Sequence, residues 1–330
     1  MSRGYMEVAN VISGAAMNIN GQTTFSKEFP MGEGWYKMML RIGISVVIGT
    51  GTTPIAESEL LFIKGVMLKT DRGELLCNLP GRALYKIAVI KAGSPPRKDA
   101  MAAATAVYYV NLPIIFVDWR TVRPEDTVLD TSRYSSVSLQ ITLGTVADLF
   151  TVVGTSSVTA TLDCEIERSY GPLPFPDENG NGGGKPLFHI SYDYRPPVDA
   201  SVNLYIDLER SPDMSVKRYY VHSGTAGTAG VPFSGANSDA IQSVINLKDQ
   251  NRFIQKDRAH AMIRDHNKDQ YSLESVLTGI EVFDFIRDGS LASALATADK
   301  SVLQYAWTNQ GGVAALSIVT CVAEMIRTLK

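Results

Sequence analysis

Two segments of the chain repeat one another at a spacing of about half its length. A shift of 178 positions places residues 63–86 on residues 241–264 without a gap, and Asp71 then falls on Asp249 among matching apolar residues. A period of this size indicates two copies of one domain and not a solenoid of short repeats. The total of 330 residues also suits two domains of about 150 residues, each large enough to bury its own core.

A second and looser repeat follows the first in each half. Residues 114–117 resemble residues 283–286, and both segments precede a polar loop and another apolar stretch. The two repeated segments begin 51 residues apart in the first half, at residues 63 and 114. In the second half they begin 42 residues apart, at residues 241 and 283. We therefore expect the first copy to carry about nine extra residues.

Alternation of apolar and polar residues is the dominant local pattern in both halves. It runs through residues 42–48, 137–143 and 158–167 of the first half, and through residues 188–194 and 202–208 of the second. A period of two places all the apolar side chains of a strand on one face. The pattern therefore predicts antiparallel sheets with one face in water and one face in a core.

Helices are expected to be few and short. A serine and two prolines at 94–96 precede a run of strong helix formers, which predicts a capped helix at residues 97–106 that holds the extra residues. Residues 81–91 and 290–299 are interpreted as helical turns. The remaining regular structure is expected to be strands.

Two segments are too rich in glycine or proline to sustain a strand ladder or a helix. Residues 171–186 contain four prolines and five glycines and are interpreted as a linker. Residues 222–238 are interpreted as a long exposed loop. With residues 1–24 taken as an N-terminal arm, the two domains are expected to span residues 25–170 and 187–330.

The charge pattern and the hydropathy pattern exclude several classes of protein. The net charge is −3, and the first 26 residues carry only Arg3 and Glu7 as charged side chains, so a basic arm for nucleic acid is not expected. No early segment has the pattern of a secretory signal. The apolar run 313–326 is interrupted by Glu324 and is shorter than the roughly 20 residues of a membrane helix.

Two glycine-rich segments could be taken for phosphate-binding loops. In the run NGNGGGK, Asn179 occupies the place of the first glycine and Pro186 follows Lys185, whereas a phosphate loop needs a Ser or Thr there. The run GTGTTP at 49–54 lacks the third glycine of a dinucleotide-binding motif. A linker and a loop between strands are the favoured interpretations.

The four histidines do not form a recognisable metal site. His260 and His266 are six residues apart, which suits neither one face of a helix nor neighbouring strands, so solvated side chains on a connecting segment are favoured. His189 and His222 stand alone in strand-like segments and are interpreted as surface residues. No metal-binding residue is predicted.

No sequence motif supports a nucleophile or a ligand-binding site among the cysteines and tyrosines. Cys77, Cys164 and Cys321 are odd in number and widely spaced, which favours reduced and buried thiols. The tyrosine pairs at 108–109 and 219–220 could stack on sugars or bases, but aromatic residues are common in strands. We predict no catalytic residue, no cofactor-binding residue and no cofactor, and we expect the chain not to be an enzyme.

The order of these segments resembles a known family. In the first half the resemblance rests on ELLFIKGVMLKTDRGELLCNLPGRALYKI, VNLPIIFVDWR, YSSVSLQITLG and SVTATLDCEIE. In the second half it rests on DAIQSVINLKDQNRFI, GIEVFDFIRDG, VLQYAW and GGVAALSIVTCVAEMI. The chain resembles the double jelly-roll major capsid proteins of membrane-containing icosahedral bacteriophages, of the tectivirus, corticovirus and finnlakevirus types.

The resemblance implies an all-β chain of two tandem eight-stranded antiparallel jelly-roll barrels with a few short helices. It also implies a homotrimer that acts as a pseudo-hexameric capsomer and tiles an icosahedral virion shell, over an internal lipid membrane that the N-terminal arm would face. Implied partners are neighbouring capsomers, vertex (penton) proteins and minor capsid proteins, with no sequence-specific binding of nucleic acid. Synthesis in the host cytoplasm is expected.

Two other functions are compatible with the sequence. A viral spike or carbohydrate-binding β-sandwich protein would use loop aromatics to bind sugars. A two-barrel metal enzyme would share the jelly-roll architecture, but it needs a His-x-His ligand pair and the sequence contains none.

Overall fold

The computed structural model divides the chain into two compact units, residues 1–187 and 188–330. The structure describes residues 6–26, 28–49, 53–122, 124–151, 156–169, 186–194, 203–208, 210, 214–225, 241–250, 252–297, 300, 302–309 and 317–327. Within these residues no helix is long and apolar enough to cross a bilayer. Each unit is described by itself below.

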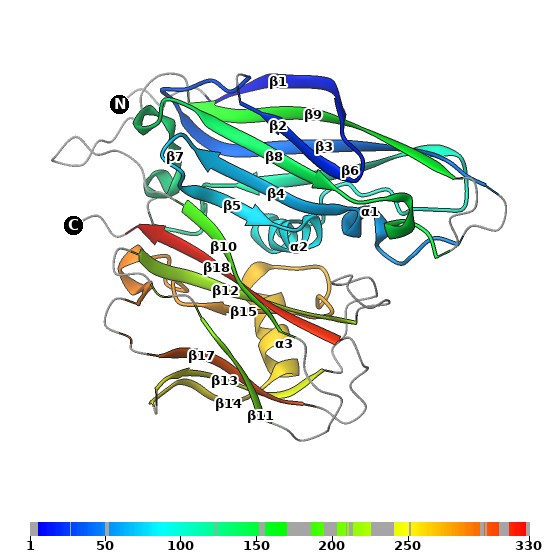
Figure 1. The fold of residues 1–330 in the computed structure, drawn as a ribbon. Coiled ribbons are helices and arrows are strands. Elements are labelled where there is room, and N and C mark those ends of the chain that lie inside the picture. Colours follow the sequence, from blue (N-terminus) through cyan, green and yellow to red (C-terminus); the bar gives the residue numbers. More distant parts are fainter. Residues whose placement is uncertain are drawn as a thin grey trace. The chain divides into compact units, whose positions relative to one another are not determined.

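The first unit contains two antiparallel sheets (Figure 1). Neighbouring strands of its first sheet follow the order β1 (Met6–Met17), β9 (Ser157–Ser169), β3 (Gly34–Val47) and β6 (Ala106–Ile115), and the short β7 (Leu129–Asp130) pairs with β3. Its second sheet has the order β2 (Gly21–Phe25), β8 (Val137–Leu143), β4 (Ile63–Thr70) and β5 (Leu75–Leu79).

The second unit repeats this arrangement. Its first sheet has the order β10 (Pro186–Tyr194), β18 (Ser317–Arg327), β12 (Met214–Thr225) and β15 (Ile280–Asp284), and the short β16 (Leu295–Ala296) pairs with β12. Its second sheet has the order β11 (Asn203–Asp207), β17 (Leu303–Asn309), β13 (Gln242–Asp249) and β14 (Arg252–Ala259).

The two units share one topology. If the eight main strands of each unit are numbered along the chain, the sheet orders are 1-8-3-6 and 2-7-4-5 in both units. Even the short strands β7 and β16 correspond, because each pairs with the third main strand of its unit. Eight strands in two sheets with these long connections make a jelly roll. The predicted fold of two tandem antiparallel jelly rolls is thus confirmed.

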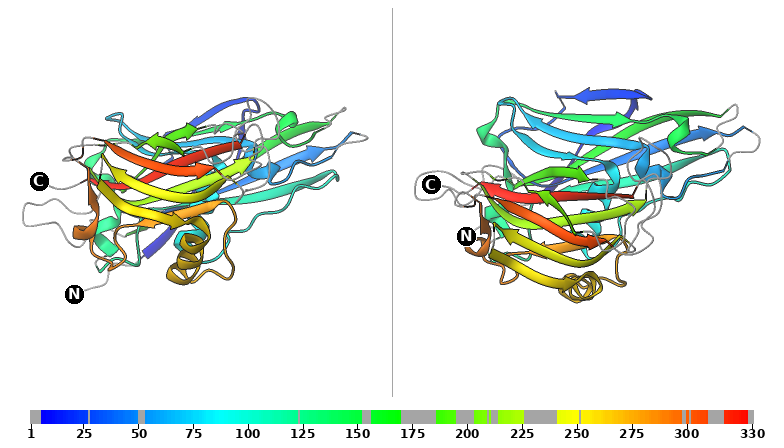
Figure 2. Two further views of the ribbon diagram at one scale, coloured as in Figure 1. Left: turned by 90° about the horizontal axis from the view of Figure 1, so that it is seen from below. Right: turned by 60° about the horizontal axis from the view of Figure 1, so that its bottom comes forward.

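Helices connect the fifth and sixth main strands of each unit. They are α2 (Gly81–Ala92), which packs on β6 and β4, and α3 (His260–Tyr271), which packs on β15, β13 and β14 (Figure 2). The remaining helical pieces are α1 (Ser58–Leu61) and the 3-10 turns η1 (Pro124–Thr127), η2 (Thr131–Arg133), η3 (Val146–Asp148) and η4 (Leu291–Ser293). The shift of 178 residues superposes β4 on β13, β5 on β14 and α2 on α3 to within a few residues.

The predicted helix at 97–106 is wrong, whereas the helical turn expected at 81–91 is confirmed as α2. It ends at Gly93, whose φ of 75° breaks the helix before the prolines. Residues 97–99 are extended along the edge of β6: Asn111 N donates to Arg97 O at 3.0 Å, and Asp99 N donates to Tyr109 O at 2.9 Å. Pairing with an open sheet edge overrides the helix propensity of this segment. We call residues 97–99 the β6 strap.

The predicted N-terminal arm at 1–24 is also wrong, because β1 and most of β2 lie within it. β1 pairs with β9 in the first jelly roll, which therefore begins at Met6 and not at residue 25. Its alternation was hidden by two register shifts on either side of Ile12 and by Gly14, which has a φ of 60°. A bulge adds a residue to one strand, so the apolar positions lose their period of two.

Two other predicted segments are described in part. Residues 171–185 of the predicted linker lie outside the described residues, and Pro186 begins β10. Residues 222–225 of the predicted loop are the end of β12, and residues 226–238 lie outside the described residues.

Gly81 starts α2 at a place with no room for a side chain. A Cβ on this residue would lie 2.7 Å from the Ile63 Cβ and 3.1 Å from the Leu60 carbonyl oxygen. We expect Gly81→Ala to lower the free energy of unfolding of the first unit by about 1–3 kcal/mol, despite the better helix propensity of alanine. Urea denaturation followed by circular dichroism measures the change.

The matched control is Gly65→Ala in β4, where the nearest atoms to a new Cβ are those of Thr142 at 3.9 Å. This variant is expected to stay within about 0.5 kcal/mol of the native stability. Equal stability of the two variants would contradict the tight contact between α2 and β4.

Candidate functional site

The histidines do not come together as a metal site. The part of the chain that the structure describes holds no group of three His, Cys, Asp or Glu side chains placed to bind an ion. His266 is exposed on α3, whereas His260 is buried at the start of α3 with its Nδ1 3.6 Å from Glu281 Oε1. His222 is buried in β12. The predictions of a solvated His260 and a surface His222 are therefore wrong, and the side chain of His189 lies outside the described residues.

The three cysteines are buried and form no disulfide, as predicted. Burial raises the pKa of the Cys77 thiol to about 12, and burial with the nearby charge of Glu165 raises the pKa of Cys164 to about 12. Because only the thiolate is a nucleophile, burial suppresses the reactivity of Cys77 and Cys164.

We expect the native protein at pH 8 to react with a disulfide reagent such as DTNB at fewer than one thiol per chain within minutes. After denaturation all three thiols should react, since unfolding removes the burial that suppresses ionisation. Absorbance of the released thiolate gives the count. A fast-reacting thiol in the folded protein would contradict the burial of these side chains.

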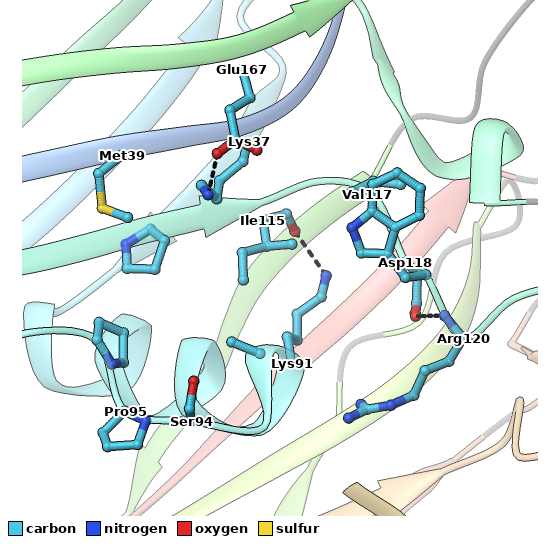
Figure 3. Close-up of a pocket in the computed structure, with 14 residues that line it drawn as sticks. Lys37, Met39, Lys91, Ser94, Pro95, Ile115, Val117, Asp118, Arg120 and Glu167 are labelled. Atoms are coloured by element: carbon cyan, nitrogen blue, oxygen red, sulfur yellow. Dashed lines mark hydrogen bonds and ion pairs between the residues drawn. The ribbon is translucent and has the colours of Figure 1, made fainter. Parts of the chain in front are cut away.

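A pocket with a volume of about 340 Å³ opens beside α2 in the first unit (Figure 3). Its apolar lining comes from β3, β6 and the turn after α2, and the loop 117–120 forms another wall. The lining residues are Lys37, Met39, Lys91, Ala92, Ser94, Pro95, Pro96, Pro113, Ile115, Val117, Asp118, Trp119, Arg120 and Glu167.

The cations of this pocket hold the surrounding backbone in place. Lys37 forms an ion pair with Glu167, and Lys91 Nζ donates to the Ile115 carbonyl oxygen at 2.8 Å (Figure 3). Arg120 Nη2 donates to the Ile90 carbonyl oxygen at 3.2 Å, near the C-terminal end of α2. The charged side chains of the pocket thus bond to neighbouring residues of the first unit.

A cluster of buried charges lies on β12 and β18 of the second unit. Glu324 is fully buried, and its carboxylate lies 2.7 Å from Lys217 Nζ and 3.3 Å from Arg218 Nη1. Successive residues of a strand normally point to opposite faces. A register shift between Val216 and Arg218 allows Lys217 and Arg218 to approach the same carboxylate.

Asp284 of β15 completes this cluster. Its Oδ2 lies 2.9 Å from Arg218 Nε and accepts hydrogen bonds from the Tyr271 hydroxyl at 2.6 Å and from Gln270 Nε2 at 3.0 Å. The Tyr220 hydroxyl donates to Glu324 at 2.7 Å. Burial and the adjacent carboxylates hold the pKa of both tyrosines well above the usual range, so they stay protonated donors.

Two buried cations therefore face two buried carboxylates, which also accept hydrogen bonds from uncharged side chains. Such an arrangement fixes the relative register of strands, and removal of one partner is strongly destabilising. No motif in the sequence marks this cluster, although Glu324 interrupts an apolar run and Lys217 and Arg218 lie within a strand. The cluster joins β12, β15 and β18 of the second jelly roll.

The structure resembles known viral shell proteins. No protein-family model matches the sequence, and no curated protein matches it. The STIV major capsid protein superposes with a TM-score of 0.69 at 12% identity, over 98% of this chain and 97% of that chain. The major capsid protein of bacteriophage PM2 superposes with a TM-score of 0.63 at 12% identity, over 99% and 98%. The Faustovirus major capsid protein gives 0.60 at 8% identity, over 100% and 92%.

At these low identities the comparison concerns the fold. The match extends over nearly the whole length of both chains, so both barrels and their order in the sequence correspond. The chain has the double jelly-roll fold of viral major capsid proteins.

Proposed function

We propose that this chain is a non-enzymatic major capsid protein that forms trimers, each of which is a pseudo-hexameric capsomer of an icosahedral shell. The observation that carries the proposal is the repetition of one barrel topology in a chain that matches viral capsid proteins end to end. A trimer of duplicated barrels presents six similar barrels to its neighbours while keeping closed threefold symmetry. Duplication therefore serves lattice geometry.

The proposed capsomer has several partners and a defined location. Neighbouring capsomers, vertex (penton) proteins and minor capsid proteins are its proposed partners, and the virion shell is its proposed location after synthesis in the host cytoplasm. A shell over an internal lipid membrane is proposed from the resemblance to capsid proteins of membrane-containing phages. Lipid in purified particles, measured by extraction and mass spectrometry, tests that last part.

The oligomeric state tests the proposal directly. Size-exclusion chromatography with light scattering should give the mass of three chains. A mass that stays at one chain up to high protein concentration would overturn the proposed trimer, because a capsomer must persist at the concentrations at which shells assemble.

A further inference from the structure

The open edges of the sheets differ sharply in their protection. Among edge strands with described side chains, β2, β11 and β15 are each five residues long. The ten-residue β6 is paired with the β6 strap. Only β1, with 12 residues, and β14, with 8 residues, are both longer than five residues and without a strand or strap on their outer side among the described residues. An open edge presents unpaired N–H and C=O groups that can pair with another strand.

The β1 edge exposes apolar side chains, and its protection consists of the two register shifts beside Ile12. Its sequence contains no Lys, Arg or Pro, the residues that commonly block edge-to-edge pairing. Met6 is 57% exposed and Val8 is 58% exposed. The exposed Glu165 of β9 lies directly opposite the exposed Asn10, which adds a negative charge beside the edge.

The β14 edge also exposes an apolar side chain, but its charge is opposite to that beside the β1 edge. Phe253 is 40% exposed, and the ammonium groups of Lys248 and Lys256 lie 5.2 and 5.4 Å from the centre of its ring. Lys256 also lies 3.8 Å from Asp257, but both side chains are more than 60% exposed, so that ion pair is weak. The edge therefore offers an aromatic group held between two cations.

We infer that β1 of one copy of the chain pairs edge to edge with β14 of a second copy. The backbone groups of the two edges can complete each other, their apolar side chains can meet, and the Glu165 carboxylate matches the lysines beside Phe253. A contact between two different surfaces of the same chain is heterologous and closes a ring when repeated by rotation. This inference rests on the proposed trimer and names the strands that hold it together.

Carbodiimide cross-linking of the unmodified protein tests the contact. Light and ¹⁵N-labelled chains are mixed, allowed to exchange and treated, and the linked peptides are identified by mass spectrometry. A link between Glu165 and Lys256 or Lys248 is expected, with light peptides joined to heavy ones. A trimer that yields no such mixed link would overturn the inference and leave the proposed function intact, whereas a chain that never forms trimers would overturn both.

Charge reversal gives an independent test. Glu165→Lys and Lys256→Glu should each raise the protein concentration at which half of the trimer dissociates by about tenfold, because each places like charges together. The double variant should recover the native value. The matched controls Glu274→Lys and Arg72→Glu change exposed residues that lie outside β1, β9, β13 and β14, and they should leave the trimer unchanged. Single variants as stable as the native trimer, or a double variant no better than the singles, would contradict the inference.

Discussion

Glu324→Gln is expected to lower the free energy of unfolding of the second unit by about 3–5 kcal/mol, because it leaves two buried cations short of a negative partner. Lys217 and Glu324 are 0% exposed and Arg218 is 1% exposed, so water cannot replace the lost charge. Glutamine keeps the size of the side chain, so the loss reports on charge and not on a cavity. Differential scanning calorimetry measures this loss as a lower unfolding temperature.

Glu274→Gln is the matched control, since Glu274 is exposed on the loop after α3 and its replacement should change stability by less than about 0.5 kcal/mol. A loss below about 1 kcal/mol for Glu324→Gln would show that the ion cluster does not stabilise the second jelly roll.

Trp35→Ala is expected to destabilise the first unit by about 3–5 kcal/mol, because it empties the centre of the core. Trp35 is 0% exposed, its ring lies 5.9 Å from that of Phe29 and 6.4 Å from that of Phe116, and its indole N–H donates to the Pro30 carbonyl oxygen at 3.1 Å. Urea denaturation followed by circular dichroism gives the stability of the variant.

Trp119→Ala is the matched control for the same chemical change. Trp119 is 63% exposed and stacks on Tyr36 with ring centres 6.1 Å apart, so we expect a loss of about 0.5–1 kcal/mol. Losses of equal size for the two tryptophans would contradict the assignment of Trp35 to the core.

The double jelly roll could be predicted from the sequence because its evidence is periodic and repeated. Strands such as β8 and β9 bury one face and alternate cleanly. The shift of 178 residues detected a segment in which two strands and a helix follow one another at nearly the same positions in both units. The predicted apolar stretch at 137–143 coincides with β8. A strand with one face in the core and one face in water alternates apolar and polar residues, so its sequence pattern predicts it.

The failures have specific physical causes. Residues 97–106 have good helix propensity, but residues 97–99 pair with the open edge of β6, a contact far along the chain that propensity does not include. β1 was missed because its bulges interrupt the period of two. His222 was placed on the surface because a polar residue in a strand suggests a wet face, whereas Tyr219 to Ser223 are all buried in β12.

The pocket and the ion cluster were harder to predict from the sequence than the fold. The pocket beside α2 and the ion cluster around Glu324 each join segments that are far apart in the sequence, and no local motif marks either set.

Electron microscopy of the purified oligomer distinguishes the proposed capsomer from other assemblies. We expect particles with threefold symmetry and a hexagonal outline, in which six barrel-shaped densities surround the axis. Class averages that show a single pair of barrels, or rings with a number of chains other than three, would contradict the proposed capsomer.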